Sequence, residues 1–370
     1  MSSLYPVISM NGRLPTIDSG LDPHRGCGGP AIDNAEGRRK AQRERLPGWF
    51  RTSLPTGESQ SRYVQTKNNV QEHGLSTVCE EARCPNIHDC WGRGTATFMI
   101  AGEICTRGCK FCAVGTAKTP PPPNPDESVE LASSILSMGL DYAVITVVNR
   151  DDLSDGGAAH YRKCITKVFE ENPDVGLELL CSDLDGNLVA LDSLLDRLPL
   201  KVFAHNVECV PRLDELVRDP RASFEQSLMI LREAKLLRPD LLTKTSIMVG
   251  LGESNDEVSE AMELLREANV DMITLGQYLQ PSYRHLPVDR FPEPEMFADW
   301  DRIARELGFK AVASGPLVRS SYRAGLLWKE AMGGGSVVAS NSNESVKSHP
   351  IQEIQMRHTR PEYQEGVAGK

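Results

Sequence analysis

Short apolar runs alternate with amphipathic helical stretches through the middle of the chain, and this alternation restricts the fold more than any other feature. Each apolar run is rich in β-branched residues and bounded by turn residues, which is typical of a buried strand. A further strand, Lys310–Ala313, is expected after a helix at Pro294–Leu307. The other predicted strands are Ala96–Ala101, Tyr142–Val148, Val175–Leu180, Lys201–Ala204, Lys244–Val249 and Met272–Leu275.

The stretches between these strands carry apolar residues at positions i, i+3, i+4 and i+7, which lie on one helical face. Asp126 and Asn255 are expected to cap two of the helices. Six strand–helix repeats imply a parallel α/β sheet, so we predict a partial (β/α)6 barrel of the TIM type. The predicted helices are Ser128–Met138, Ala158–Glu171, Leu188–Leu198, Phe224–Leu237 and Asp256–Ala268.

The charge and the apolar pattern exclude some partners. The 370 residues carry a net charge of −10, which argues against a nucleic-acid partner. The sequence contains no run of about 18 apolar residues, so no membrane-spanning segment is expected. The first 30 residues lack a secretory core, and we expect a cytoplasmic, reducing compartment where the ten cysteines are ligands or core thiols.

Residues 1–45 are rich in glycine, proline and charge, and they are predicted to form a mobile arm. The alternative is a transit peptide for an organelle matrix. Transit peptides are usually poor in acidic residues, and this arm contains Asp18, Asp22, Asp33 and Glu36.

Polar side chains gather where the predicted strands end. Because the carboxyl ends of barrel strands share one face, these side chains are expected to lie together at an active site. For each of them a structural ion pair or turn contact is the alternative role. The candidates for cofactor binding are Asn149, Arg150, Asp151, Glu178, Asn206, Gly250, Gly252 and Glu253.

Six cysteines form two triplets within a short stretch of the chain. Cys79, Cys84 and Cys90 have the spacing C-x4-C-x5-C. Three thiolates at such intervals can converge on one soft metal centre and leave it one ligand short, which keeps a position open for chemistry. The second triplet, with the spacing C-x3-C-x2-C, consists of Cys105, Cys109 and Cys112.

The second triplet, with Phe111 before its last cysteine, resembles the signature loop of the radical S-adenosylmethionine (radical SAM) superfamily. The resemblance implies that Cys105, Cys109 and Cys112 hold a 4Fe–4S cluster whose fourth iron binds S-adenosylmethionine. A structural zinc site is the alternative, but such sites usually close with four protein ligands.

The first triplet is similar to the auxiliary-cluster motif of the lipoyl synthase family. In that family three such cysteines and a serine from a C-terminal Arg-Ser-Ser-Tyr motif hold a second 4Fe–4S cluster, and Arg319–Tyr322 has this sequence here. We assign the ligand role to Ser321 in preference to Ser320. His88 is expected to face solvent or pack locally, and it is not assigned as a ligand.

The resemblance covers about residues 46–322 and implies a domain order. The mobile arm at 1–45 precedes an auxiliary-cluster segment at 46–95 and a radical SAM partial barrel at 96–315. A C-terminal segment at 316–332 carries the Arg-Ser-Ser-Tyr motif and caps the barrel, and residues 333–370 form a disordered tail.

The implied reaction inserts two sulfur atoms, at C6 and C8, into an octanoyl chain bound to a lysine of a carrier protein. Two S-adenosylmethionine molecules would be consumed, and the auxiliary cluster would be the sacrificed sulfur donor. Such carriers are the glycine cleavage H protein and the lipoyl (E2) domains of 2-oxoacid dehydrogenases, and the electron donor would be a ferredoxin or flavodoxin. A basic patch at Arg218 and Arg221, or at Arg319 and Arg323, is expected to meet acidic carriers.

Two other functions remain open at this point. A biotin-synthase-like sulfur inserter would share the second triplet but should lack the first triplet and its serine partner. A non-catalytic two-cluster electron carrier should have four protein thiolates per cluster. His205 is expected to be a core histidine, and Cys164, Cys181 and Cys209 are expected to be buried thiols.

Overall fold

Seven parallel strands form one sheet, which confirms the predicted α/β class. β1 pairs with β4 from Thr95 opposite Tyr142, and β7 pairs with β8 from Lys244 opposite Met272. The order places β1 and β9 at the two ends of the sheet, as in a partial barrel. The strands in this order are β1 (Thr95–Ile100), β4 (Tyr142–Val147), β5 (Gly176–Leu180), β6 (Val202–Ala204), β7 (Leu242–Val249), β8 (Met272–Gln277) and β9 (Ala311–Gly315).

This computed structural model describes residues 46–50, 56–72, 77–81 and 84–333. The predicted arm at 1–45, with Cys27, and the tail from residue 334 onward lie outside the described residues. Among the described residues, no helix combines the length and apolar character needed to cross a membrane.

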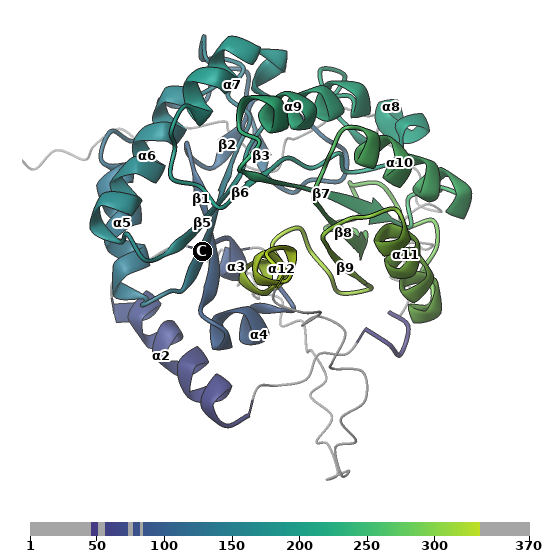
Figure 1. Ribbon diagram of the computed structural model, residues 1–370, viewed down its shortest axis with the longest axis horizontal. Coiled ribbons are helices and arrows are strands. Elements are labelled where there is room, and N and C mark those ends of the chain that lie inside the picture. Colours follow the sequence, from purple (N-terminus) through teal and green to yellow (C-terminus); the bar gives the residue numbers. More distant parts are fainter. Residues whose placement is uncertain (1–45, 51–55, 73–76, 82–83, 334–370) are drawn as a thin grey trace, which may run out of the picture. The chain divides into compact units, whose positions relative to one another are not determined.

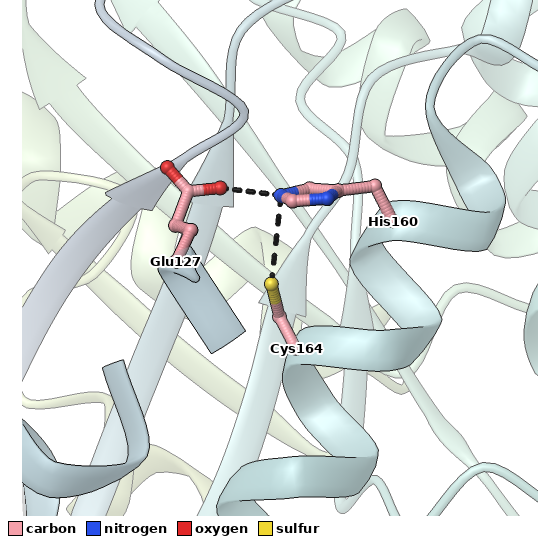
Figure 2. A group of neighbouring side chains, drawn as sticks. All are labelled: Glu127, His160 and Cys164. Carbon is pink, nitrogen blue, oxygen red and sulfur yellow. Dashed lines mark hydrogen bonds and ion pairs between the residues drawn. The ribbon is translucent and has the colours of Figure 1, made fainter. Parts of the chain in front are cut away.

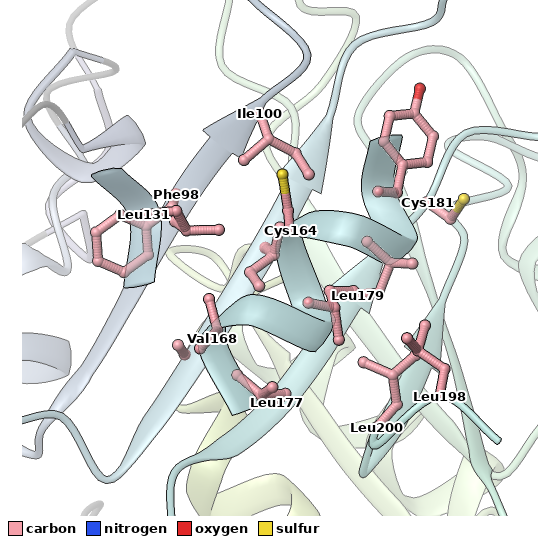
Figure 3. Close-up of a cluster of buried hydrophobic side chains, with 14 of the residues drawn as sticks. Phe98, Ile100, Leu131, Cys164, Val168, Leu177, Leu179, Cys181, Leu198 and Leu200 are labelled. Carbon is pink, nitrogen blue, oxygen red and sulfur yellow. The ribbon is translucent and has the colours of Figure 1, made fainter. Parts of the chain in front are cut away.

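Six helices cover the outer face of the sheet (Figure 1). Side chains of β1 and β5 pack against α5 and α6, and Figure 3 shows Phe98, Leu131 and Val168 among them. A second cluster joins β7 and β8 to the later helices around Phe297 and Trp300. The covering helices are α5 (Glu127–Ser137), α6 (Ala158–Glu171), α7 (Leu188–Leu195), α9 (Phe224–Leu237), α10 (Asn255–Glu267) and α11 (Pro294–Glu306).

Three details of the predicted helices were wrong. Ser254, not Asn255, caps α10, and it forms a capping box with Glu257. The Asp126 side chain makes no capping hydrogen bond. Helix α7 ends at Leu195 because Arg197 has a positive φ and Leu198 precedes a proline, which disfavours helical backbone there.

The last helix, α12 (Ala324–Ala331), lies on the concave side of the sheet (Figure 1). Its Leu327 packs with inward-facing residues of β6 to β9, and Trp328 stacks on Tyr142 at 5.9 Å between ring centroids. A Cβ at Gly325 would lie 3.0 Å from Cβ of Tyr142, so the helix approaches β4 more closely than a larger residue would allow. The C-terminal segment thus caps the inside of the barrel, as expected.

Short elements complete the two cysteine regions and the loops above the strands. The first triplet lies around α3 and α4, and the second begins at β2. These elements are α2 (Glu58–Glu72), α3 (Val78–Glu81), α4 (Ile87–Gly92), β2 (Ile104–Cys105), β3 (Gly115–Thr116), η1 (Leu184–Gly186), η2 (Pro211–Leu213) and α8 (Asp214–Val217).

Candidate functional site

The loop of the second cysteine triplet follows β1 at the carboxyl end of the sheet. Backbone contacts hold it against two other loops of this face. The Lys110 N–H donates to Val217 O at 2.9 Å, and the Lys110 carbonyl accepts from Leu286 at 3.1 Å. The Asp219 N–H lies 3.3 Å from Cys109 Sγ, and His285 Nε2 lies 3.0 Å from Cys112 O. Separate strand exits therefore fix the positions of the cysteines.

Arg107, inside this loop, is the centre of a buried ion-pair network. Its guanidinium donates to Asp183 at 2.6 Å and to Asp151 at 2.8 Å, while only 1% of its side chain is exposed. The Asp151 carboxylate also accepts from Thr106 Oγ1 at 2.8 Å and from Arg221 at 3.0 Å. The network joins the cysteine loop to the exits of β4 and β5 and to the loop at Arg221.

Asp219 links the same loop to its neighbour. Its carboxylate accepts from the Gly108 N–H at 2.8 Å and from Arg221 Nε at 2.9 Å. Burial would raise the pKa of Asp219, but these donors outweigh it and lower that pKa to about 2. Asp219 is therefore ionised at neutral pH and holds the N–H next to Cys109.

The first triplet is more buried than the second. Cys79 and Cys90 are buried and Cys84 is half-buried, with the Cys84 N–H donating to Cys79 O at 3.0 Å. Burial raises the pKa of all three thiols, that of Cys90 to about 12. For Cys90, the nearby Cys84 and Cys79 add to this effect of burial.

The C-terminal motif meets this triplet in space. Asn86 Nδ2 donates to Leu317 O at 2.6 Å, and Arg323 Nε donates to Asp89 at 2.6 Å. The backbone N–H of Arg323 donates to Cys90, and the Arg319 guanidinium lowers the pKa of Cys84 against the larger effect of burial. Ser320 and Ser321, both half-buried, lie between these two arginines.

The sulfur spacing distinguishes two kinds of metal centre. Zn–S bonds of about 2.3 Å place tetrahedral thiolates about 3.8 Å apart, whereas a 4Fe–4S cluster holds its ligands on separate iron atoms and spreads them further. Neither triplet, as far as the described residues extend, brings three ligand atoms within 4.8 Å of one another. The described residues thus show no preformed zinc site at either triplet, and the ligand roles of the six cysteines stay a prediction.

A pocket of about 160 Å³ lies between the two cysteine regions, inside the barrel. Phe111 of the cysteine loop lines one side, and Arg319 and Ser320 line another. Asn206, Glu208 and residues at the ends of β7 and β8 complete the wall. A larger hollow of about 360 Å³, next to Asp141 and Val175, lies at the amino ends of β4 and β5, away from this face.

Asn149, Arg150 and Asp151 all support the cysteine loop. The Asn149 carbonyl accepts from the Thr106 N–H and hydroxyl, both at 3.0 Å. Arg150 is buried, donates to Ala101 O at 3.0 Å and pairs with Asp152 at 2.8 Å. These contacts give the three residues the structural role that was the alternative, and their contact with a cofactor stays a prediction.

Glu178 lies inside the barrel below the pocket. Its carboxylate accepts from Lys244 Nζ at 2.7 Å and from the Tyr142 hydroxyl at 3.1 Å, and the ion pair is almost fully buried. Asn206 lines the pocket and hydrogen-bonds Glu208, whose pKa burial raises. Of these two candidates, only Asn206 borders the pocket.

Gly250, Gly252 and Glu253 form a tight turn after β7. Glu253 accepts from the Gly250 N–H at 2.7 Å and from the Leu251 N–H at 2.9 Å. Gly250 has φ +92°, and a Cβ there would lie 2.5 Å from the Arg290 carbonyl. The close neighbour that requires glycine at position 250 is therefore the chain itself, and contact of this turn with a cofactor stays a prediction.

The expectations for the remaining histidines and cysteines are confirmed. His205 is buried between Cys181 O at 2.8 Å and Ser227 Oγ at 2.9 Å, and burial lowers its pKa to about 4. His88 packs on Tyr63, with ring centroids 4.4 Å apart. Cys164, Cys181 and Cys209 are buried.

The structure gives little support to the expected basic patch for the carrier. Arg218 is buried on Val207 O and Ser227 Oγ, and Arg319 is half-buried near the first triplet. Only 11% of the Arg323 side chain is exposed. Arg221 is 47% exposed, but two carboxylates pair with it.

Three residues that support the site, Arg107, Asp219 and Asn86, were not predicted from the sequence. Arg107 lies between Cys105 and Cys109 of the signature. A charged residue inside a predicted metal-binding loop was the sequence feature that could have indicated its role. Its partners Asp151 and Asp183 follow different strands, and only the folded barrel brings them together.

Comparisons with known proteins find matches that include residues of both cysteine regions. The model of the radical SAM superfamily matches residues 99–276, and the model of the N-terminal domain of lipoyl synthase matches residues 28–84. A mitochondrial lipoyl synthase of Bos taurus is 51% identical over 293 residues, which are 78% of this chain and 78% of that protein. The mitochondrial lipoyl synthase of Homo sapiens is 50% identical, with the same coverage of both chains.

A chloroplastic lipoyl synthase of Arabidopsis thaliana is also similar. It is 50% identical over 291 residues, which are 77% of this chain and 73% of that protein. The names of these relatives give no support to the cytoplasmic placement expected from the sequence.

Proposed function

Because the chain belongs to the lipoyl synthase family of the radical SAM superfamily, we propose that its two cysteine triplets hold the two 4Fe–4S clusters of that family. The enzyme inserts sulfur into protein-bound octanoyl chains and uses S-adenosylmethionine. Cys105, Cys109 and Cys112 would hold the cluster that binds S-adenosylmethionine. Cys79, Cys84, Cys90 and Ser321 would hold the auxiliary cluster.

The pocket between the two triplets carries this proposal. An unactivated C–H bond has no acidic proton, so general acid–base groups cannot open it and a radical is needed. When bound, the cluster at Cys105, Cys109 and Cys112 would supply the electron that cleaves S-adenosylmethionine, and the auxiliary cluster would supply sulfur. With Phe111 on one wall and Arg319 and Ser320 on another, this pocket could hold a substrate chain near both proposed centres.

The chain's own residues would orient and shield these groups. Asn206 and Glu208 line the pocket beside Phe111 and offer polar contacts to the cofactor. Arg319, half-buried near Cys84, would offset negative charge at the first triplet. The network of Arg107 would fix the loop of Cys105, Cys109 and Cys112, and burial would shield Cys79 and Cys90 from water.

The direct test uses the anaerobically reconstituted enzyme with an octanoyl-lysine peptide, S-adenosylmethionine and a strong reductant. Mass spectrometry should find a peptide that has gained two sulfur atoms, with about two molecules of 5′-deoxyadenosine per lipoyl group. Deoxyadenosine without a thiolated peptide would exclude the assigned substrate. Neither product from a protein with intact clusters would point to the electron carrier instead.

The enzyme acts on lipoyl-carrier proteins, and we propose that both the glycine cleavage H protein and the lipoyl (E2) domains of 2-oxoacid dehydrogenases serve. The same assay, run with each octanoylated carrier and with reduced ferredoxin or flavodoxin, ranks the carriers and donors by kcat/KM. A carrier without detectable turnover would be removed from the proposal.

We further propose that the protein works in an organelle matrix, in place of the cytoplasm. The names of its relatives, mitochondrial and chloroplastic, support this proposal. Fractionation of the cells that produce it, with matrix and cytosolic markers, should recover the protein with the matrix and protected from added protease. Recovery with the cytosolic marker would contradict it.

A further inference from the structure

A third group of potential metal ligands lies outside both cysteine triplets, between α5 and α6 (Figure 2). Glu127 is the first residue of α5, and His160 and Cys164 are one turn apart on α6, so their side chains share a helical face. One ligand atom from each residue lies within 4.8 Å of the other two. The three side chains approach one another from two helices, as Figure 2 shows.

Both contacts of this group are made to the same nitrogen. Glu127 Oε2 hydrogen-bonds His160 Nε2, and Cys164 Sγ lies 3.6 Å from that nitrogen. In a nucleophilic triad the thiol and the carboxylate would contact opposite ring nitrogens, so that the imidazole could pass a proton between them. Because both partners contact Nε2, and because Cys164 is fully buried, this group is not built as a nucleophilic triad.

Three potential ligand atoms thus converge on one another, and the protons available among them are one on Nε2 and one on the Cys164 thiol, which is a weak donor. If Nε2 carries a hydrogen, it donates that hydrogen to the Glu127 carboxylate. The Cys164 sulfur is then at most a weak acceptor from the same N–H group. Without that hydrogen, the lone pairs of nitrogen and carboxylate face each other. A cation placed between the three atoms would satisfy all of them at once.

We propose that Glu127, His160 and Cys164 bind one divalent transition-metal ion, for which Zn²⁺ is the best match. Carboxylate, imidazole and thiolate are all zinc ligands, and bonds of about 2.3 Å to sulfur and 2.0–2.1 Å to nitrogen place these atoms about 3.6 Å apart in a tetrahedron. The Sγ to Nε2 separation is 3.6 Å. The ion replaces the thiol proton, which is released to solvent.

A water molecule would take the fourth position. The side chains of His160 and Glu127 are 15% and 17% exposed, so solvent and the ion have a route to the group. Burial raises the pKa of the Cys164 thiol to about 12, which keeps it protonated until a metal ion displaces the proton.

The site is attached to the start of the cysteine loop. Glu127 Oε2 accepts from the Ala101 N–H at 2.8 Å, and the Ala101 carbonyl accepts from Arg150 at 3.0 Å. Ala101 directly follows β1 and has φ +69°, in the left-handed region. A bound ion would join α5 and α6 to each other and to the segment that leads into Cys105. Its role is structural.

The test measures zinc in the holoenzyme, which has both iron–sulfur clusters loaded under anaerobic conditions. The protein is equilibrated with Zn²⁺ buffered by a chelator, and zinc and iron per chain are counted by mass spectrometry. Cys164→Ala and His160→Gln each remove one ligand. Cys209→Ala is the matched control, because Cys209 is a buried thiol that hydrogen-bonds Asp214 and lies outside the group.

We expect the wild type and Cys209→Ala to hold one zinc ion per chain more than Cys164→Ala and His160→Gln, at equal iron content. Zinc X-ray absorption should find one sulfur at about 2.3 Å and nitrogen or oxygen at about 2.0–2.1 Å. Equal zinc in all four proteins, including none in any, would overturn the proposal. If Cys164→Ala does not fold, the partly exposed His160→Gln variant gives the same answer.

Discussion

Replacing Cys84 by Ala should abolish formation of the lipoyl product while 5′-deoxyadenosine continues to form. Cys84 belongs to the triplet assigned to the sulfur-donating cluster and not to the loop of Cys105, Cys109 and Cys112. Changes that only orient a metal ligand cost 10–100-fold, so loss of a direct ligand should lower lipoyl formation by at least about 100-fold. The measurement is the ratio of lipoyl peptide to deoxyadenosine in a single-turnover reaction.

Two further variants make this result specific. Cys112→Ala should lose both products, because it removes a ligand of the cluster assigned to cleavage of S-adenosylmethionine. Cys209→Ala changes a buried thiol outside both triplets and should keep both products. If Cys84→Ala and Cys112→Ala lost the two products in the same proportion, the division of roles between the triplets would be wrong.

Replacing Arg107 by Met should destabilise the protein by about 3–5 kcal/mol, the usual cost of removing one partner of a buried ion pair. Asp183 would be left buried without its guanidinium, and Asp151 would keep only the more exposed Arg221. The loop of the second triplet should then bind its cluster less completely. Urea unfolding and the iron content per chain measure the two effects.

The control for this variant is Arg302→Met. Arg302 is 58% exposed and pairs with Glu306 one turn along α11, so its loss should cost less than about 1 kcal/mol. An equal loss of stability in both variants would contradict the importance of the Arg107 network.

Low pH should weaken the ion-pair network of Arg107. Burial raises the pKa of Asp183, but His205 and Arg107 outweigh it and lower that pKa below its ordinary value. A lowered carboxyl pKa contributes stability above the ordinary value of about 4, and this contribution is lost as the pH falls through the folded value. The stability of Arg107→Met should therefore depend less on pH below about 4 than that of the wild type.

The strands and most helices could be predicted because their signal is local. Helix α9 has the predicted bounds, since an apolar face and a capping Ser223 both belong to its own sequence. Helix α2 was missed because its composition is polar and gives little periodic signal. Helix α12 was missed because it is short and packs inside the barrel, where the strands decide its position.

In the candidate site, too, the features with a local sequence signal could be predicted, and the features that depend on the fold could not. Each cysteine triplet is a local spacing, so the sequence alone is enough to predict it as a ligand set, and the ligand roles stay a prediction. The pocket between the triplets depends on Phe111 and Arg319, which are far apart in the chain, and no spacing rule predicts that they share a cavity. The burial of Arg218 and the half-buried state of Arg319 also depend on the fold, so the sequence could not show that these guanidiniums are largely withdrawn from the surface.

The contact between Asn86 and Leu317 spans 231 residues and has a consequence for the order of synthesis. The ribosome makes the Cys79, Cys84 and Cys90 region early, but the segment that packs on it emerges only after all seven strands. Contacts of such long sequence separation form late in folding. The nascent chain would therefore hold an incomplete auxiliary centre for most of its synthesis, and iron–sulfur delivery to that centre belongs after release from the ribosome.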